Sequence, residues 1–125
     1  MVDALKIQKI DFATIEFYPN FVVAIINPEE NLDLPQVRIL EDIVEDYYKG
    51  NEYIYLSYRK NDYSVNPLLY SSLIDIKSLK AIGIVSESFS RLQIANFEKQ
   101  FCPIPYEIFN SLDEAKAWAS GYLNE

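Results

Sequence analysis

Apolar segments of two kinds alternate along most of this chain, and this alternation restricts the fold more than any other feature of the sequence. Short runs rich in β-branched and aromatic residues are typical of strands. Between them lie longer segments in which apolar residues recur at every third or fourth position, the spacing of one helix face. Regular strand–helix alternation predicts crossover connections and parallel strands. The sequence therefore predicts an α/β fold with a small mixed, mostly parallel sheet of roughly four to six strands and about four helices.

The predicted order of elements is ββ(β)-α-β-α-β-α-β-α. The expected strands are residues 5–12, 14–17, 21–26, 52–58, 79–85 and 104–109, and the expected helices are 34–49, 67–76, 88–100 and 112–123. Residues 14–17 and 21–26 form either a hairpin around Pro19-Asn20 or one bulged, bent strand. Asp33, Asn66 and Ser111 have the residue types and the positions of helix N-caps. Pro35 and Pro67 follow two of these caps, where proline is tolerated in a first helical turn.

Helical spacing also predicts which side chains face the sheet. The first helix presents an inward stripe of Val37, Leu40, Ile43, Val44 and Tyr47, and an acidic outer face of Glu41, Asp42, Glu45 and Asp46. In the helix over 67–76 the inward residues are Leu69, Leu73 and Ile76. The third helix directs Ile94, Phe97 and Phe101 inward. In the last helix Trp118 is predicted to be a core residue, because its small alanine neighbours let the indole pack on the sheet.

Composition excludes several classes of function. The 125 residues, half of them hydrophobic, predict one folded domain over residues 1–125. The formal net charge of −8 argues against nucleic acid and anionic membrane surfaces as partners. Because the chain has no histidine, catalysis by a Ser-His-Asp or Cys-His arrangement and zinc sites with histidine ligands are excluded within it. No catalytic residue, metal or cofactor is predicted.

Cysteine usage and hydropathy suggest a compartment. The single cysteine, Cys102, cannot form an intrachain disulfide and has the surroundings of a small buried hydrophobic residue. The lack of a disulfide framework favours the reducing cytoplasm. The first residues do not have the pattern of a signal peptide, and no apolar run approaches the roughly 20 residues of a membrane span. We therefore expect a cytoplasmic protein.

Tyrosines are concentrated in the middle of the sequence. Of the ten in the chain, most lie between Tyr47 and Tyr70. One interpretation is ordinary packing, because tyrosine suits strands and interfaces. The other is a groove at the carboxyl end of the central strand, where parallel sheets tend to bind ligands. The residues predicted to form this candidate binding surface are Tyr53, Tyr55, Tyr58, Arg59, Tyr63, Ser64, Asn66 and Tyr70.

Arg59 and Lys60 form the only adjacent basic pair of the chain. In so acidic a chain such a pair could receive a carboxylate or a phosphate. An ordinary polar loop is the simpler interpretation of the same residues.

The C-terminal segment carries a resemblance to a known family. Phe109-Asn-Ser-Leu-Asp-Glu-Ala-Lys-Ala-Trp118 places an aromatic residue, a polar turn and Glu-Ala-x-x-Trp in succession after a strand. Together with the order of elements, this pattern resembles the SpoIIAA-like family, related to the STAS domains of anti-sigma-factor antagonists and grouped with the SEC14/CRAL-TRIO lipid-binding fold. The resemblance implies a non-enzymatic domain.

The same resemblance points to the turn before the second helix. STAS switches carry a phosphorylated serine there, in an Asp-Ser-Ser-Gly-like turn. This chain has Asp62-Tyr-Ser-Val-Asn-Pro67, which makes Ser64 the candidate phosphoacceptor but lacks the Ser-Gly pair. Phosphate at a helix start adds charge where the amides are free.

The sequence therefore predicts an intracellular binding or regulatory module. The leading hypothesis is recognition of a protein partner by the 62–66 turn and the following helix. The alternative is a carrier of a small apolar or lipid-like ligand in a groove beside the tyrosines. An enzyme would require a buried carboxylate or tyrosine with a strongly shifted pKa in a cleft. The oligomeric state stays open, with a homodimer as one candidate.

Overall fold

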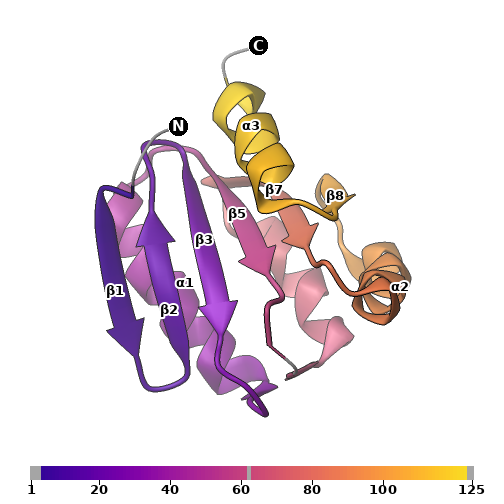
Figure 1. Cartoon of the computed structure of the whole chain (residues 1–125). Helices are drawn as coiled ribbons and strands as arrows, with labels where there is room; N and C mark the ends of the chain where they lie inside the picture. The colour runs from indigo at the N-terminus through magenta and orange to yellow at the C-terminus, as the bar shows by residue number, and fades with distance from the viewer. Residues whose placement is uncertain (1–3, 62, 124–125) are drawn as a thin grey trace.

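A computed structural model describes residues 4–61 and 63–123, and for Ser64 the backbone alone. A six-stranded sheet forms the centre of the molecule, in the order β1-β2-β3-β5-β7-β8 (Figure 1). Its strands are β1 (Lys6–Ile10), β2 (Ala13–Phe17), β3 (Phe21–Ile26), β5 (Tyr53–Tyr58), β7 (Leu79–Val85) and β8 (Tyr106–Phe109). β1, β2 and β3 are antiparallel, whereas β3, β5, β7 and β8 run parallel. The predicted mixed, mostly parallel sheet is confirmed.

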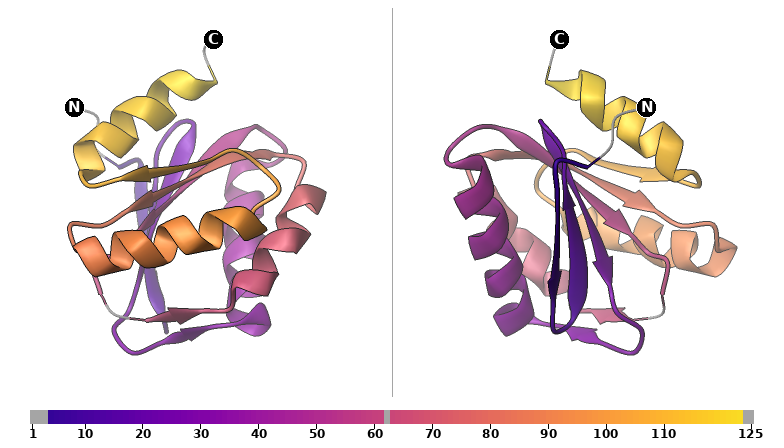
Figure 2. Two further views of the ribbon diagram at one scale, coloured as in Figure 1. Left: turned by 90° about the vertical axis from the view of Figure 1, so that its right-hand side faces the viewer. Right: turned by 60° about the vertical axis from the view of Figure 1, so that its left-hand side comes forward.

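Helices cover the two faces of this sheet unequally (Figure 2). One face carries α1 (Leu34–Tyr48), the 3₁₀ helix η1 (Pro67–Asp75) and α2 (Phe89–Glu98), which continues into a short 3₁₀ turn, η2 (Lys99–Phe101). The other face carries α3 (Leu112–Tyr122). Two short strands, β4 (Asn31–Leu32) and β6 (Ser64–Val65), pair in parallel away from the main sheet. The predicted α/β class, with about four helices, is also confirmed.

The helix starts follow from local capping. Asp33 caps α1 in a reciprocal capping box with Gln36. Asn66 caps η1 by accepting a hydrogen bond from the Leu68 amide at 3.1 Å. Ser111 accepts one from the Glu114 amide at 3.4 Å and caps α3. Each cap satisfies an amide that has no partner within its helix, so these polar residues determine where the helices begin.

The second helix is a 3₁₀ helix rather than the α-helix that a plain strand–helix pattern suggests. The hydroxyls of Ser71 and Ser72 donate to the carbonyl oxygens of Leu68 and Leu69, at 3.0 and 2.9 Å. The Ile76 amide likewise donates three residues back, to the Leu73 carbonyl. Serine hydroxyls that compete for backbone carbonyls weaken a regular α-helical ladder. The adjacent serines therefore favour the tighter turn.

The inward face of α2 differs from the prediction. Ile94 and Phe97 are 55% and 56% exposed, whereas Ala95 and Glu98 are buried. Glu98, rather than the apolar residues, faces the sheet because it forms an ion pair with a buried arginine, Arg59. A buried charge requires such a partner, so this pairing determines the rotation of the helix.

The position of Trp118 is also a partial correction. Ala115 and Ala119 are the fully buried residues of α3, and Trp118 is partly buried. Its ring packs between Phe109 and Tyr122, with centroids 5.2 Å away in both cases. It also covers Gly83, where a Cβ would lie 3.1 Å from the indole. The two alanines allow α3 to lie close to the sheet, and the Trp118 ring packs at the edge of this helix–sheet interface.

The helical spacing did not predict the burial of Tyr48, which is the more buried of the two tyrosines of α1. Its hydroxyl donates to the carbonyl oxygens of Tyr18 and Phe21, at 2.8 and 2.6 Å. Tyr47, predicted to face inward, is partly buried and stacks on Phe17 with ring centroids 4.1 Å apart. Tyr48 thus anchors α1 to the β2–β3 turn.

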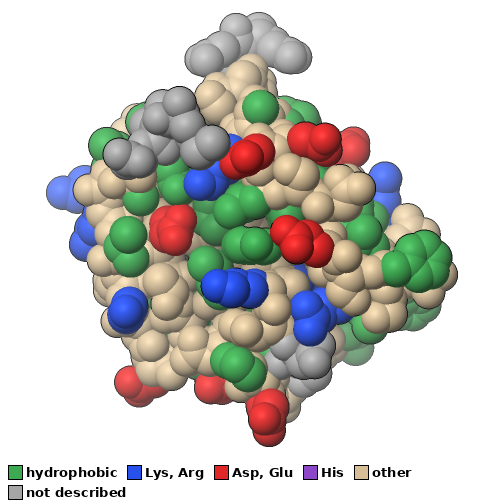
Figure 3. Space-filling model, viewed as in Figure 1, with side chains coloured by type: hydrophobic (Ala, Val, Ile, Leu, Met, Phe, Trp, Pro, Cys, Tyr) green, Lys and Arg blue, Asp and Glu red, His purple; other side chains and the backbone are tan. Residues whose placement is uncertain are grey.

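The face that carries α3 is only partly covered. Hydrophobic side chains run across the exposed part of the sheet and are interrupted by charges of both signs (Figure 3). Two hydrophobic residues at the start of the edge strand β1 are mostly exposed: Leu5, just before the strand, by 61%, and Ile7, within it, by 59%. In the part of the chain that the structure describes, no helix is both long and apolar enough to cross a membrane.

Candidate functional site

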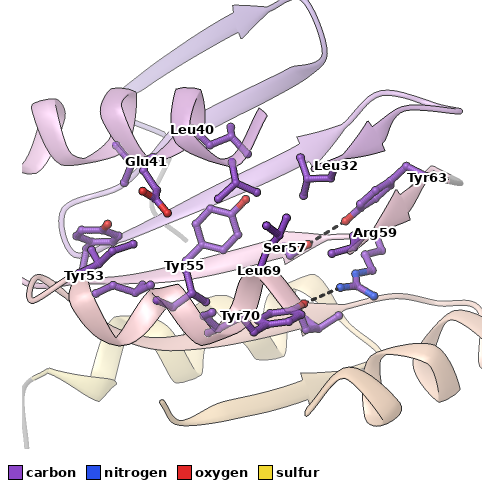
Figure 4. Close-up of a pocket in the computed structure, with 18 residues that line it drawn as sticks. Leu32, Leu40, Glu41, Tyr53, Tyr55, Ser57, Arg59, Tyr63, Leu69 and Tyr70 are labelled. Carbon is purple, nitrogen blue, oxygen red and sulfur yellow. Dashed lines mark hydrogen bonds between the residues drawn. The ribbon is translucent and has the colours of Figure 1, made fainter. Parts of the chain in front are cut away.

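A cavity of about 100 Å³ lies on the helix-rich face, between β5, α1 and η1 (Figure 4). Aliphatic side chains supply most of its wall. They are Leu32, Val37, Leu40, Val44, Val65, Leu69, Leu73, Ile76, Leu79, Ile82 and Ile84. Leu32 and Val65 belong to β4 and β6, so this small strand pair closes one side of the cavity. The polar groups of the wall are few and come mainly from tyrosines, one arginine and one glutamate.

Strand alternation explains which residues of β5 reach the cavity. Tyr53, Tyr55 and Ser57 share one face of the strand and line the cavity. Tyr58 lies on the opposite face and packs against the cluster beneath α3. Successive side chains of a strand point to opposite faces. The prediction that Tyr58 belongs to the same surface as Tyr53 and Tyr55 is therefore wrong.

The structure brings most of the candidate surface together around this one cavity. Tyr53, Tyr55, Arg59, Tyr63 and Tyr70 line it. Asn66 instead caps η1. The Ser64 backbone pairs with Asn31 in the β4–β6 pair, but the Ser64 side chain and Asp62 lie outside the described residues. The cavity also extends along the face of β5 to Tyr53, and so is not confined to the carboxyl end of the strand.

Arg59 is buried, 6% exposed, and is part of a charged cluster rather than of a polar loop. Its Nη1 and Nη2 donate to the two carboxylate oxygens of Glu98, at 3.0 and 2.6 Å. The Tyr70 hydroxyl donates to Glu98 Oε1 at 2.7 Å and accepts from Arg59 Nη2 at 3.2 Å. Burial is the largest single influence and lowers the pKa of Arg59, but the hydrogen bond to Glu98 and the electrostatic interactions with Tyr63, Tyr70 and Glu98 together outweigh it, so the net shift is upward. The two side chains form a buried ion pair, so their charges cancel.

The sequence did not predict Glu98 as part of the site. It lies 39 residues after Arg59 and sits on a helix whose apolar spacing favoured a different inward face. The one usable signal was Arg59 itself, because it directly follows an apolar strand whose alternation directs it inward. A buried arginine requires a carboxylate, and α2 supplies it.

Three tyrosines of the wall, Tyr53, Tyr55 and Tyr70, are held protonated. Burial is the main cause that raises the pKa of Tyr53, Tyr55 and Tyr70. The Tyr63 hydroxyl pairs with Ser57 Oγ at 3.1 Å. Tyr55 makes no hydrogen bond through its hydroxyl to any residue within 4–61 or 63–123. Protonated phenols donate hydrogen bonds and do not act as bases near neutral pH. Because the hydroxyls of Tyr63 and Tyr70 already have partners, the Tyr55 hydroxyl is the one that can donate to an occupant.

The position of Glu41 differs from the prediction, which placed it on the acidic outer face of α1. It is partly buried and lines the cavity, and its carboxylate points toward the side of Tyr53 and Tyr55 (Figure 4). Burial first, then the charges of Asp42 and Glu45, raise its pKa, while Arg38 lowers it. Glu45 is also partly buried, and its Oε2 has no hydrogen-bond partner among the described residues. Asp42 and Asp46 are exposed, as predicted.

A second cleft, of about 300 Å³, adjoins the cavity. The two share Arg59, Tyr63 and Val65 as walls. Arg91, on the far side of the cleft, donates to the carbonyl oxygens of Arg59 and Lys60, both at 3.3 Å. In the described ranges, no group of three or more cysteine, aspartate or glutamate side chains is placed to hold a metal ion. The arrangement can thus enclose a small molecule and offer it hydrogen bonds.

No protein-family model matches the chain, and no curated protein is significantly similar to it in sequence. A solved structure is similar in fold: an uncharacterized protein of the DUF3478 family, with a SpoIIAA-like fold, from Shewanella loihica PV-4. The TM-score is 0.53, with 14% sequence identity over 91% of this chain and 90% of that one. The chain has a SpoIIAA-like fold. The family resemblance predicted from the C-terminal segment and the order of elements is confirmed at the level of this fold. In this SpoIIAA-like domain the cavity lies beneath α1 and η1, and the segment 109–118 lies on the opposite face.

Proposed function

We propose that this SpoIIAA-like domain is a binding module that holds a small, mostly apolar molecule in the cavity between β5, α1 and η1. The observation that carries the proposal is the wall itself, in which aliphatic and tyrosine side chains surround a space with few polar groups. Ligand sites of proteins have this composition. The volume of about 100 Å³ is comparable with the ~150 Å³ of an apolar cavity that accepts benzene.

A cavity of this size lowers the stability of the folded protein while it is empty. At roughly 24 cal/mol per Å³, a fully closed cavity of about 100 Å³ would correspond to about 2 kcal/mol of lost stability, and this value is an upper bound because the cavity is partly open. Larger side chains on η1 would remove that cost. Protein sites that lower stability often serve a function, which supports binding over a packing defect.

The proposal is of a non-enzymatic, intracellular role. The chain has no histidine, and burial raises the pKa of the Cys102 thiol, which weakens it as a nucleophile. Burial holds Tyr53, Tyr55 and Tyr70 protonated at the cavity. The single cysteine and the absence of a disulfide framework are compatible with the cytoplasm.

Binding of benzyl alcohol, followed by amide chemical shifts, tests the proposal. We expect saturable shifts in β5 and η1, with a Kd on the order of 1 mM, a plausible affinity for so small a ligand. Leu73→Phe fills the cavity and should weaken binding at least tenfold. The matched control is Ile74→Phe, because Ile74 follows in the same helix and is 63% exposed. Shifts that do not saturate, or that both variants retain equally, would contradict cavity binding.

A second candidate function is recognition of a protein by the start of η1. The observation that favours it is the exposure of Leu68, at 68%, at the start of the helix that borders the cavity. Phosphorylation of Ser64, just before this helix, belongs to the same proposal. Once a partner is identified, Leu68→Asp should weaken its binding at least tenfold, while Leu5→Asp on the opposite face should leave it unchanged. Equal effects of the two substitutions would remove the η1 surface from consideration.

A further inference from the structure

We propose that the cavity selects a small organic amine, whose ammonium group pairs with Glu41 and whose apolar part fills the space between β5, α1 and η1. This inference rests on the proposed function and specifies the chemical class of the ligand. It follows from the charges of the wall, from the surroundings of Glu41 and from the aromatic side chains beside it.

The wall has one charge that is not cancelled. Of its charged residues, Arg59 and Glu41, the first is neutralised by both carboxylate oxygens of Glu98. Glu41 forms no ion pair within the described residues. Arg38, one turn earlier on α1, is exposed and too far away to form one. The cavity therefore presents a single net negative charge to an occupant.

The surroundings of Glu41 favour a cation there. Burial and the neighbouring charges of Asp42 and Glu45 raise its pKa, so its ionised form is disfavoured when the cavity is empty. An ammonium group would relieve both the desolvation and the repulsion between the carboxylates. A carboxylate ligand would increase the repulsion. Both Nη atoms of Arg59 already donate to Glu98, and its buried Nε has no hydrogen-bond partner among the described residues. Arg59 can therefore offer an occupant one further donor, but its charge is already balanced by Glu98.

Aromatic side chains complete the recognition of a cation. Tyr53 and Tyr55 lie on the side of the cavity toward which Glu41 points (Figure 4). The faces of aromatic rings attract ammonium groups, most strongly where water is excluded. The Tyr55 hydroxyl, which has no partner among the described residues, offers an oxygen that can accept a hydrogen bond from the ammonium group. A carboxylate with two adjacent tyrosines thus matches an amine better than a neutral alcohol of equal size.

The test compares benzylamine with benzyl alcohol, which have the same ring and the same number of non-hydrogen atoms. Their Kd values are measured at neutral pH by amide-shift titration of the whole chain. We expect benzylamine to bind about tenfold more tightly, the effect of one charge-assisted hydrogen bond. Glu41→Gln should remove this preference, so that benzylamine and benzyl alcohol bind to the variant with equal Kd values. Asp42→Asn is the matched control, because it removes the same charge from an exposed neighbour, and it should retain the preference.

The outcomes separate this inference from the proposed function. If benzyl alcohol binds in the cavity and benzylamine binds no more tightly, the inference is wrong and the proposed function stands. A preference for benzylamine that survives Glu41→Gln, or that Asp42→Asn removes equally, also contradicts it, because the acidic surface alone would then attract the amine. If neither probe binds, the proposed function fails, and the inference fails with it.

Discussion

Helices pack on both faces of the sheet, but the side chains that separate them from the strands differ in size between the two faces. Beneath α3, Ala115, Ala119 and Gly83 allow the helix to approach the strands closely, and the contact is filled. Beneath α1 and η1, tyrosines and leucines hold the helices away from β5 and leave the cavity. Small residues bring elements together, whereas large side chains with polar ends leave space and chemistry between them. The first face provides stability, and we expect the second to provide function.

The largest effect should come from the ion pair that joins β5 to α2. Glu98→Ala leaves the Arg59 charge buried and unpaired, and should lower the free energy of unfolding by about 3–5 kcal/mol. The double variant Arg59→Met, Glu98→Leu replaces both charges and should lose clearly less. Urea denaturation measures both variants. If the double variant is the less stable one, the charges themselves hold the cavity face together, contrary to this account.

On the opposite face, Trp118→Ala should cost about 2–3 kcal/mol, below the full range for a buried aromatic residue, because the indole is partly exposed. The same denaturation experiment measures it. A loss below roughly 1 kcal/mol is typical of an exposed residue and would mean that the indole does not support the contact of α3 with β7.

Added volume should distinguish the two faces directly. Ala119→Leu forces extra atoms into a filled contact and should lower the free energy of unfolding by about 1–3 kcal/mol. Leu73→Phe places extra atoms in the cavity and should cost less than about 1 kcal/mol or be stabilising. Thermal unfolding of both variants provides the comparison. Equal losses would show that the two faces are equally filled.

The smallest effect concerns Glu41. Its pKa is raised in the folded state, so the protonated form is favoured by folding and the ionised form is disfavoured. Its contribution is thus favourable below the unfolded-state pKa of about 4 and is lost as the pH rises through the higher folded-state value. Glu41→Gln should therefore raise the melting temperature slightly at pH 7, by at most a few degrees, and the gain should shrink at pH 4. A lower melting temperature at pH 7 would mean that Glu41 has a stabilising partner.

These contrasts also show what the sequence could predict. Local rules were sufficient for the caps at Asp33 and Asn66 and for the placement of Tyr53 and Tyr55 on one face of β5. Tyr58 was misplaced because the tyrosines were grouped by residue type, although strand alternation directs it to the other face.

Long-range partners and empty space could not be predicted in this way. The burial of Glu98 depends on Arg59, 39 residues earlier, and therefore contradicts the apolar pattern of α2. The cavity depends on how far α1 and η1 stand from β5, which no single segment encodes. Local patterns thus predicted the fold and part of the wall, but neither the ion pair nor the cavity volume.

Xenon binding in crystals tests the central claim most directly, because xenon enters empty apolar cavities without needing a specific polar group. We expect one strong xenon peak between β5, α1 and η1, bordered by Leu69 and Leu73, and no peak beneath α3. A crystal that shows no xenon in this cavity, or shows xenon beneath α3 instead, would contradict the assignment of packing to one face and binding to the other.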